Sequence, residues 1–144
     1  MKICVSCTGN KLDGYLSITL NPVVGFTNME AAVPPASAEE ILAEDLIEFF
    51  PLKKVEQAID YLLSKLRHKG QITLSCKDIY VLNYLITRRE FDITNINLAL
   101  YGDSLSVRSV LSSEDLINIL TSRGLKIVKK IHDGIKAIVV AERQ

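Results

Sequence analysis

The sequence predicts a single α/β domain: a Rossmann-like, mostly parallel twisted sheet that ends in an antiparallel β-hairpin. Three observations support this fold class. Short strand-like segments alternate with turn residues near the N-terminus, a helical segment leads directly into a strand, and an Asp-Gly pair divides the last strand-like stretch. A chain of 144 residues suffices for one hydrophobic core, and neither a repeat nor a linker divides it. We therefore expect residues 1–144 to form one domain.

Four segments in the first third of the chain have the composition of strands. They are Met1–Val5, Tyr15–Leu20, a weaker one within Gly25–Val33, and Glu39–Glu44. The first two are separated by the turn-forming residues Gly9, Asn10, Asp13 and Gly14. Adjacent parallel strands are normally joined by about a dozen or more residues, usually with a helix. The first connection is therefore expected to be a loop.

The first clearly helical segment is predicted from Leu52 to Gly70, where Lys69-Gly70 supplies a basic last turn and a stop. One apolar stripe follows the helical period, and it consists of Val55, Ile59, Leu62, Leu63 and Leu66. A strand at Gln71–Cys76 follows at once, so helix and strand alternate as in a β-α-β unit.

Two shorter helices are predicted between Asp78 and Tyr101, with a break near Arg88–Asp92. They lie outside the alternation of strands and helices, as a helical insertion or cover at about residues 78–101. Their apolar residues occupy more than one face, so we expect these helices either to cover the cleft of the domain or to join a second subunit in a homodimer.

The end of the chain carries the strongest local signals. Ser112, with Asp115 three residues later, matches a capping box at the start of a helix that Gly124 ends. Two strand-like segments follow, Leu125–His132 and Ile135–Glu142, with a predicted turn at Asp133-Gly134.

Composition excludes several classes of function. Seventeen basic and seventeen acidic residues cancel, so binding to nucleic acid or to an anionic membrane is not expected. No apolar stretch approaches the ~20 residues of a membrane span, no cleavable signal layout is present, and three cysteines suit a reducing compartment, so a soluble, cytoplasmic protein is expected. Cys4 and Cys7 form a C-x-x-C, but no second pair of ligands accompanies it, so no metal site is expected.

In order along the chain, five sequence blocks resemble a compact subgroup of class I S-adenosylmethionine-dependent methyltransferases. The blocks are VSCTGN, GYLSITLNP, EEILAEDLIEFF, LRHKGQITLSCKD and VLSSEDLINILTSRGLKIVKK, the last of them preceded by a short LYGD match. In that family the otherwise parallel sheet ends in a hairpin. The resemblance therefore implies the methyltransferase fold for nearly the whole chain, and S-adenosylmethionine as the cofactor.

The resemblance also implies where the cofactor would bind, and this chain departs from the family there. The turn that holds the methionine part of the cofactor corresponds to Ser6, Cys7, Thr8, Gly9 and Asn10. Ser6 and Thr8 stand where the family has glycines. Thr19 replaces the carboxylate that binds the ribose hydroxyls, and Asn21 could compensate in part. The sequence thus predicts a degenerate motif that binds S-adenosylmethionine weakly or not at all.

Acidic residues complete the expected cleft. Glu44 and Asp45 match the positions after the fourth strand, either as a carboxylate pair facing the ligand or with Asp45 capping a helical turn and Glu44 solvated. Glu30 corresponds to a position beside the adenine and Asp78 to the mouth of the sheet, or each is a cap or turn residue. No catalytic residue is assigned.

Three functions fit these observations. One is a small S-adenosylmethionine-dependent methyltransferase with an unidentified acceptor. Another is a noncatalytic interaction module that keeps the fold after losing the cofactor. The remaining one is a binder of a different small ligand in the same crevice, because function belongs to the site and not to the scaffold.

Overall fold

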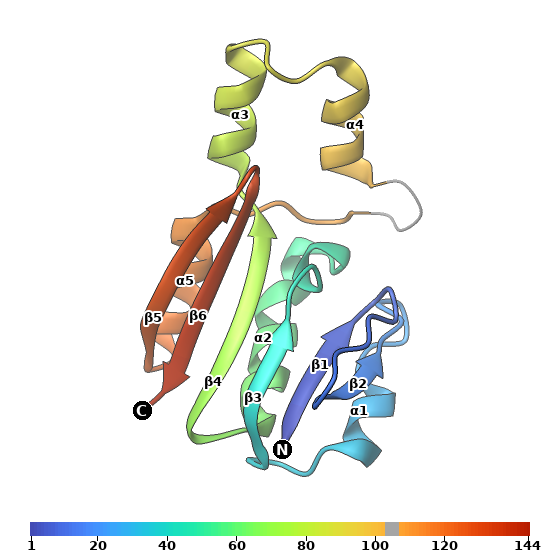
Figure 1. Cartoon of the computed structure of the whole chain (residues 1–144), viewed down its shortest axis with the longest axis vertical. Helices are drawn as coiled ribbons and strands as arrows, with labels where there is room; N and C mark the ends of the chain where they lie inside the picture. The colour runs from blue at the N-terminus through green and yellow to red at the C-terminus, as the bar shows by residue number, and fades with distance from the viewer. Residues whose placement is uncertain (103–106) are drawn as a thin grey trace.

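The computed structural model describes residues 1–102 and 107–144, which form one six-stranded sheet with helices beside it (Figure 1). The strand order is β2-β1-β3-β4-β6-β5. Strands β1, β2, β3 and β4 run parallel to one another, whereas β6 is antiparallel to β4 and to β5. The predicted fold class, a mostly parallel sheet with a C-terminal antiparallel hairpin, is confirmed.

The elements are β1 Lys2–Ser6, β2 Leu16–Thr19, α1 Thr27–Ala32, β3 Ala38–Ala43, the 3-10 helix η1 Ile47–Phe49, α2 Leu52–Lys65, β4 Leu66–Lys77, α3 Ile79–Thr87, α4 Ile93–Tyr101, α5 Ser113–Ser122, β5 Leu125–Asp133 and β6 Lys136–Arg143.

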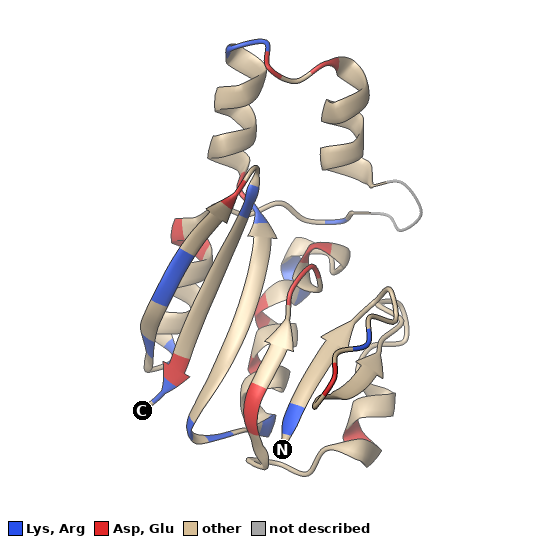
Figure 2. Ribbon diagram, viewed as in Figure 1, with Lys and Arg blue, Asp and Glu red and all other residues tan. Residues whose placement is uncertain are grey.

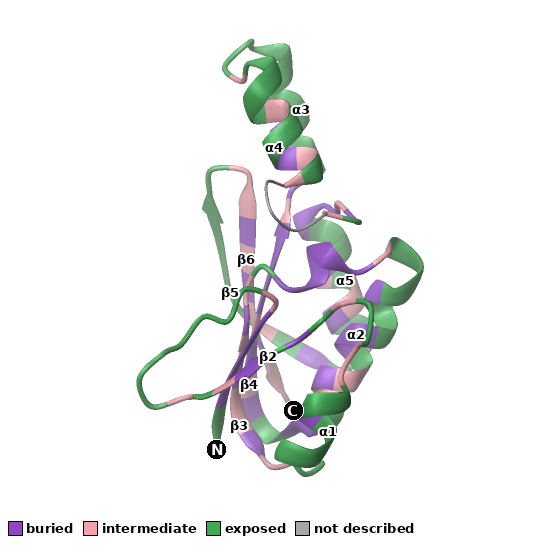
Figure 3. Ribbon diagram, turned by 90° about the vertical axis from the view of Figure 1, so that its right-hand side faces the viewer, coloured by how far each residue is buried: buried purple, intermediate pink, exposed green. Residues whose placement is uncertain are grey.

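The hydrophobic core lies between one face of the sheet and the helices α1, α2 and α5 (Figure 3). Residues of the sheet alternate between the two faces. The fully buried side chains on the helical face include Ile3, Val5, Ile41, Ile72, Leu74 and Val139. On the opposite face, the Tyr15 hydroxyl donates to Glu40 at 2.5 Å, whereas residues 8–14 of the loop after β1 are exposed. The core is therefore built mainly on one side of the sheet.

The first connection is a loop, as predicted, but the weak strand expected within Gly25–Val33 is wrong. Residues Thr27–Ala32 form α1, which begins with the N–H groups of Met29 and Glu30 bonded to the Phe26 carbonyl. The sequence Met-Glu-Ala-Ala favours a helix. Met29 is fully buried, so one side chain fixes this short helix against the core.

The helix predicted to reach Gly70 ends earlier, at Lys65. Leu66 already pairs with Ala38 of β3, and Lys69 has a left-handed φ of +57°, which a helix cannot accommodate. A Cβ on Gly70 would lie 3.1 Å from the Ala38 carbonyl oxygen and 2.8 Å from Leu66 Cδ1. Gly70 thus permits the close approach of β4 to β3 and does not cap α2.

The hairpin is confirmed, but its turn is shifted by one residue. Asp133 pairs with Lys136, so the two turn residues are Gly134 and Ile135, not Asp133 and Gly134. Gly134 has φ +59°, and a positive φ at the first turn position alone is typical of a type II′ turn. The register of β6 against β4 then brings Lys136 beside Lys77.

The two predicted helices between Asp78 and Tyr101 are α3 and α4. Each begins at an aspartate: Asp78 accepts from the Tyr80 N–H at 3.0 Å, and Asp92 accepts from the Asn95 N–H at 2.8 Å. Both helices project from the body beyond the carboxyl ends of the parallel strands (Figures 1 and 3).

The predicted capping box of α5 is present. Ser112 Oγ accepts from the Asp115 N–H at 3.0 Å, and the Asp115 carboxylate accepts from the Ser112 N–H at 3.1 Å. Ser112 is almost fully buried, so water cannot replace either bond. The box therefore fixes where α5 begins.

Replacement of the capping serine, Ser112→Ala, should lower the free energy of unfolding by about 1–2 kcal/mol, because the Asp115 N–H loses its acceptor. Urea denaturation would show this as a lower midpoint with an unchanged slope. The control is Ser122→Ala in the exposed last turn, which should cost less than about 0.5 kcal/mol. Equal losses in the two variants would contradict this role of the box.

Candidate functional site

A crevice lies where β1 meets β3. The chain passes from β1 to β2 on one side of β1 and later to β3 on the other, so the carboxyl ends of β1 and β3 form a topological switch point. Ligands of open α/β sheets bind at such points. The crevice has a volume of about 230 Å³ and is lined by Cys4, Val5, Ser6, Asn10, Lys11, Leu12, Leu42, Glu44 and Asp45. Four of the predicted site residues, Ser6, Asn10, Glu44 and Asp45, therefore meet there.

The Ser6 hydroxyl organises the loop over this crevice. Ser6 is buried at the end of β1, and its Oγ accepts hydrogen bonds from the N–H groups of Gly9 and Asn10, both at 3.1 Å. Gly9 has φ +77°, a conformation that glycine adopts without strain. Two backbone donors that could bind an anionic ligand are thus already bonded within the protein.

Cys7 and Thr8 belong to the same turn and Thr19 ends β2, but none of these three residues lines the crevice. Thr19 pairs with Ser6, and its Oγ1 lies 3.6 Å from the position that a Cβ on Gly9 would take. Cys7 is half-buried. Burial, and to a lesser extent the charge of Glu48, raises the pKa of its thiol to about 11, so the thiol stays protonated near neutral pH.

Asn21 and Glu30 are engaged elsewhere. The Asn21 side chain accepts from the Val23 N–H at 2.9 Å within a turn. Glu30 on α1 bonds the hydroxyl of Tyr61 and lies 3.2 Å from the ammonium of Lys65, both on α2. Neither Asn21 nor Glu30 lines the crevice. The structure thus separates these two from the other predicted site residues.

Glu44 and Asp45 share one cation. Lys136 Nζ, at the start of β6, lies 2.8 Å from Glu44 Oε2 and 3.0 Å from Asp45 Oδ2. Burial lowers the pKa of Lys136, but its bonds to the two carboxylates outweigh burial and raise it above the ordinary value. Asp45 does not cap η1, so the capping alternative for it is wrong. Its N–H instead donates to Ser75 Oγ at 2.7 Å, which holds it beside Lys136.

Glu48 is a buried carboxylate that the sequence did not single out. It lies on η1, next to the end of β3, and is 6% exposed. Its Oε2 makes no hydrogen bond, and Lys77 Nζ is 3.5 Å from it. Burial is the main reason that its pKa is raised above the ordinary value. The apolar sequence around Glu48 was the only available signal, since its partner Lys77 is distant along the chain.

Asp78 has a structural role. Besides capping α3, its carboxylate accepts from the Ser113 N–H at 3.2 Å and lies 3.2 Å from His132 Nε2. Burial raises its pKa, but these bonds outweigh burial and lower it below the ordinary value. Asp78 therefore joins β4, α3, α5 and β5, and the turn or cap alternative is confirmed for it.

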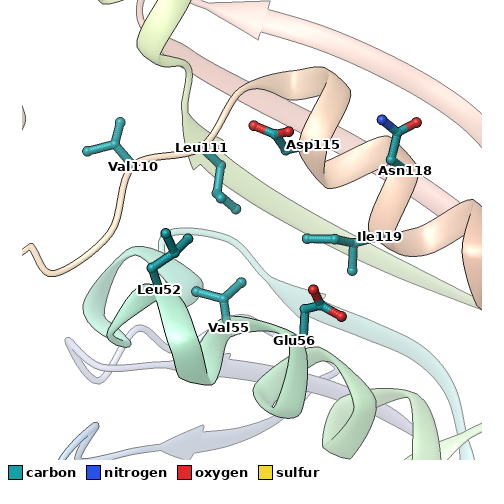
Figure 4. A pocket seen from close by; sticks show the side chains of 8 residues that line it. All are labelled: Leu52, Val55, Glu56, Val110, Leu111, Asp115, Asn118 and Ile119. Atoms are coloured by element: carbon teal, nitrogen blue, oxygen red, sulfur yellow. The ribbon is translucent and has the colours of Figure 1, made fainter.

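A larger hollow of about 470 Å³ lies between α2 and α5 (Figure 4). Its walls are mainly apolar, and two carboxylates stand at its edge. Glu56 lies 2.9 Å from Arg123, and Asp115 belongs to the capping box of α5. Both carboxylates are thus bound within the protein, and the hollow is on the helical face, away from the switch point. We therefore place the candidate site in the smaller crevice. The full lining is Leu52, Val55, Glu56, Val110, Leu111, Asp115, Asn118 and Ile119.

Two other kinds of site are absent from residues 1–102 and 107–144. No group of three or more His, Cys, Asp and Glu side chains there is arranged to hold a metal ion. Within the same residues, no helix has the length and apolar character needed to cross a membrane.

Comparison with known proteins adds evidence on the fold. No protein-family model and no curated protein matches the sequence, whereas many solved structures match the fold. A methyltransferase from Archaeoglobus fulgidus superposes with a TM-score of 0.59 at 10% identity, covering 99% of this chain and 86% of that protein. The chain has the class I methyltransferase fold. The predicted resemblance is thus confirmed at the level of the fold.

Two larger proteins share this methyltransferase fold. An O-methyltransferase family protein from Burkholderia thailandensis gives a TM-score of 0.56 at 10% identity over 90% of this chain. Magnesium protoporphyrin IX methyltransferase from Synechocystis, solved with S-adenosylhomocysteine, gives 0.55 at 15% identity, also over 90% of this chain. The chain spans 36% and 52% of their respective lengths.

The buried Glu48 predicts a specific pH dependence of stability. An unfolded glutamate releases its proton at about pH 4.3, whereas folded Glu48 retains its proton to higher pH. Between these two pKa values the folded state binds more protons, so the contribution of Glu48 to stability falls as pH rises. Glu48→Gln should remove this fall. Urea denaturation from about pH 4 to pH 8 measures the difference between the two proteins.

The exposed Glu114 on α5 provides the control, and Glu114→Gln should leave the pH profile unchanged. A profile of Glu48→Gln parallel to that of the unaltered protein would show that Glu48 titrates as it does in the unfolded chain.

Proposed function

We propose that this chain is a noncatalytic interaction module with the methyltransferase fold, whose crevice at the ends of β1 and β3 binds S-adenosylmethionine weakly or not at all. The observation that carries the proposal is the pair of hydrogen bonds from Gly9 and Asn10 to the Ser6 hydroxyl. A cofactor carboxylate would have to compete with this internal acceptor for the same two donors.

Two further features support weak binding. Thr19 supplies a hydroxyl in place of a carboxylate, so bonds of the charge-assisted class, about 1.5–3 kcal/mol, are lost to the ribose. The crevice of about 230 Å³ is also smaller than the roughly 300–1,000 Å³ of typical small-ligand pockets.

The three free cysteines suit a reducing compartment, and we therefore propose a cytoplasmic location.

A second candidate is a small S-adenosylmethionine-dependent methyltransferase with an unidentified acceptor. The position of the crevice at the switch point, with Glu44 and Asp45 on its wall, favours this alternative. The Synechocystis neighbour was solved with S-adenosylhomocysteine. In this alternative the crevice would orient the methyl donor toward the acceptor, and positioning would provide most of the catalysis.

Calorimetric titration with S-adenosylmethionine and S-adenosylhomocysteine tests the proposal. The loop glycines, the ribose carboxylate and the helix after β1 are all missing here, and each loss costs about 1–3 kcal/mol of binding free energy. Together they correspond to several powers of ten in affinity, so we expect no binding at micromolar concentrations. The triple variant Ser6→Gly, Thr8→Gly, Thr19→Asp should bind at least about tenfold more tightly, because it frees the loop donors and restores the carboxylate.

Thr121→Asp on the exposed surface of α5 is the control for added charge and should not change affinity. Micromolar binding by the unaltered protein would reject the proposal in favour of the enzyme. A folded triple variant that gains no affinity would show that the crevice is not a former cofactor site.

A further inference from the structure

The helices α3 and α4, with the turn between them, form what we call the helical arm, residues 79–101. Neither helix contains a charged residue. In each helix only one residue is buried, Leu82 in α3 and Ala99 in α4. Helices that are apolar on several faces are normally buried, so this arm presents an unusual surface for a small protein.

The exposed apolar side chains of the arm are large. Tyr80 is 69% exposed, Tyr101 65% and Ile93 72%. The remaining large exposed residues are Ile79, Tyr84, Ile86 and Leu98. With about 200 Å² for a tyrosine and somewhat less for an isoleucine or leucine, together they present roughly 700 Å². A standard interface buries about 800 Å² on each partner, so one arm has nearly the area that a stable dimer requires.

The arm does not cover the candidate site. No residue of α3 or α4 lines the crevice at β1 and β3, and both helices extend away from the body (Figure 3). The sequence left two alternatives for these helices, a cover for the cleft or a contact with a second subunit. Only the second is compatible with this placement.

We propose that the arms of two copies of this chain pack against each other about a two-fold axis as a four-helix bundle. A two-fold contact places the same surface on both partners, so charges of one sign would repel across the axis. The arm helices avoid this problem because they carry no charge. Their exposed tyrosines also belong to the residue types enriched at interface cores.

Charges at the tip of the arm argue against insertion into a lipid membrane. The turn between α3 and α4 carries Arg88, Arg89, Glu90 and Asp92, which would enter the bilayer first (Figure 2). When two arms pack against each other, the charged residues of this turn can remain in contact with water. A second copy therefore explains both the uncharged helices and the charged turn.

The experiment measures molar mass by light scattering after size exclusion, over a range of protein concentrations. The unaltered protein should have the mass of two 16.0 kDa chains. Tyr80→Lys with Ile93→Lys should raise the dissociation constant at least about 100-fold and give one chain, because each introduces a charge at the contact. Tyr101→Lys provides an independent variant on α4. All three positions are exposed, so circular dichroism should show an unchanged fold.

Val23→Lys, at a 73% exposed valine outside the arm, is the matched control and should leave the dimer intact. A single-chain mass for the unaltered protein at about 100 µM, or a dimer that survives the arm substitutions, would overturn the proposal. Flotation with neutral and anionic phospholipid vesicles completes the test. A single chain that binds vesicles through Tyr80 and Ile93 would assign the arm to a membrane surface instead.

Discussion

The nine residues between β1 and β2 are the constraint on which the architecture depends. These strands lie parallel and adjacent, an arrangement that ordinarily uses a crossover helix and thereby covers one face of the sheet. Here a loop replaces the helix, so α1, α2 and α5 build the core on the other face. On the opposite face, sheet residues such as Leu42, Thr73 and Val140 are only half-buried.

The loop also accounts for the chemistry of the crevice. Backbone N–H groups near the sheet must find acceptors, and without a crossover helix they have no helical partners. Ser6 supplies the acceptor for two of them. A glycine at this position would free those donors for a ligand, whereas serine keeps them bonded inside the protein. The stability of the loop and the binding of an anion are therefore in competition at the same two N–H groups.

Charged residues from separate strands gather at the carboxyl edge of the sheet. Lys136 reaches Glu44 and Asp45, while Lys77 lies beside the buried Glu48. Beyond this edge stands the helical arm, whose two helices carry no charged residue and share no residue with the crevice. The molecule thus separates a polar region, built on the sheet, from an apolar surface suited to association with another chain.

Local patterns in the sequence were enough to determine the fold class, the capping box at Ser112 and the approximate extent of both arm helices. Ser6, Asn10, Glu44 and Asp45 were singled out by the resemblance to the methyltransferases, and they line one crevice because residues that follow parallel strands converge at one edge of the sheet. Such signals depend on residues close together along the chain.

Features that depend on pairing between distant parts of the chain were determined only by the tertiary structure. The pairing of β4 with β3 ended α2 at Lys65, and the register of β6 placed Lys136 between the two carboxylates. Contacts across the core bury Met29, which holds the short α1 against the sheet, and Glu30 lies beside Lys65 and away from the crevice. Local propensities differ by less than about 1 kcal/mol per residue, so burial of a single large side chain or one strand pairing outweighs them.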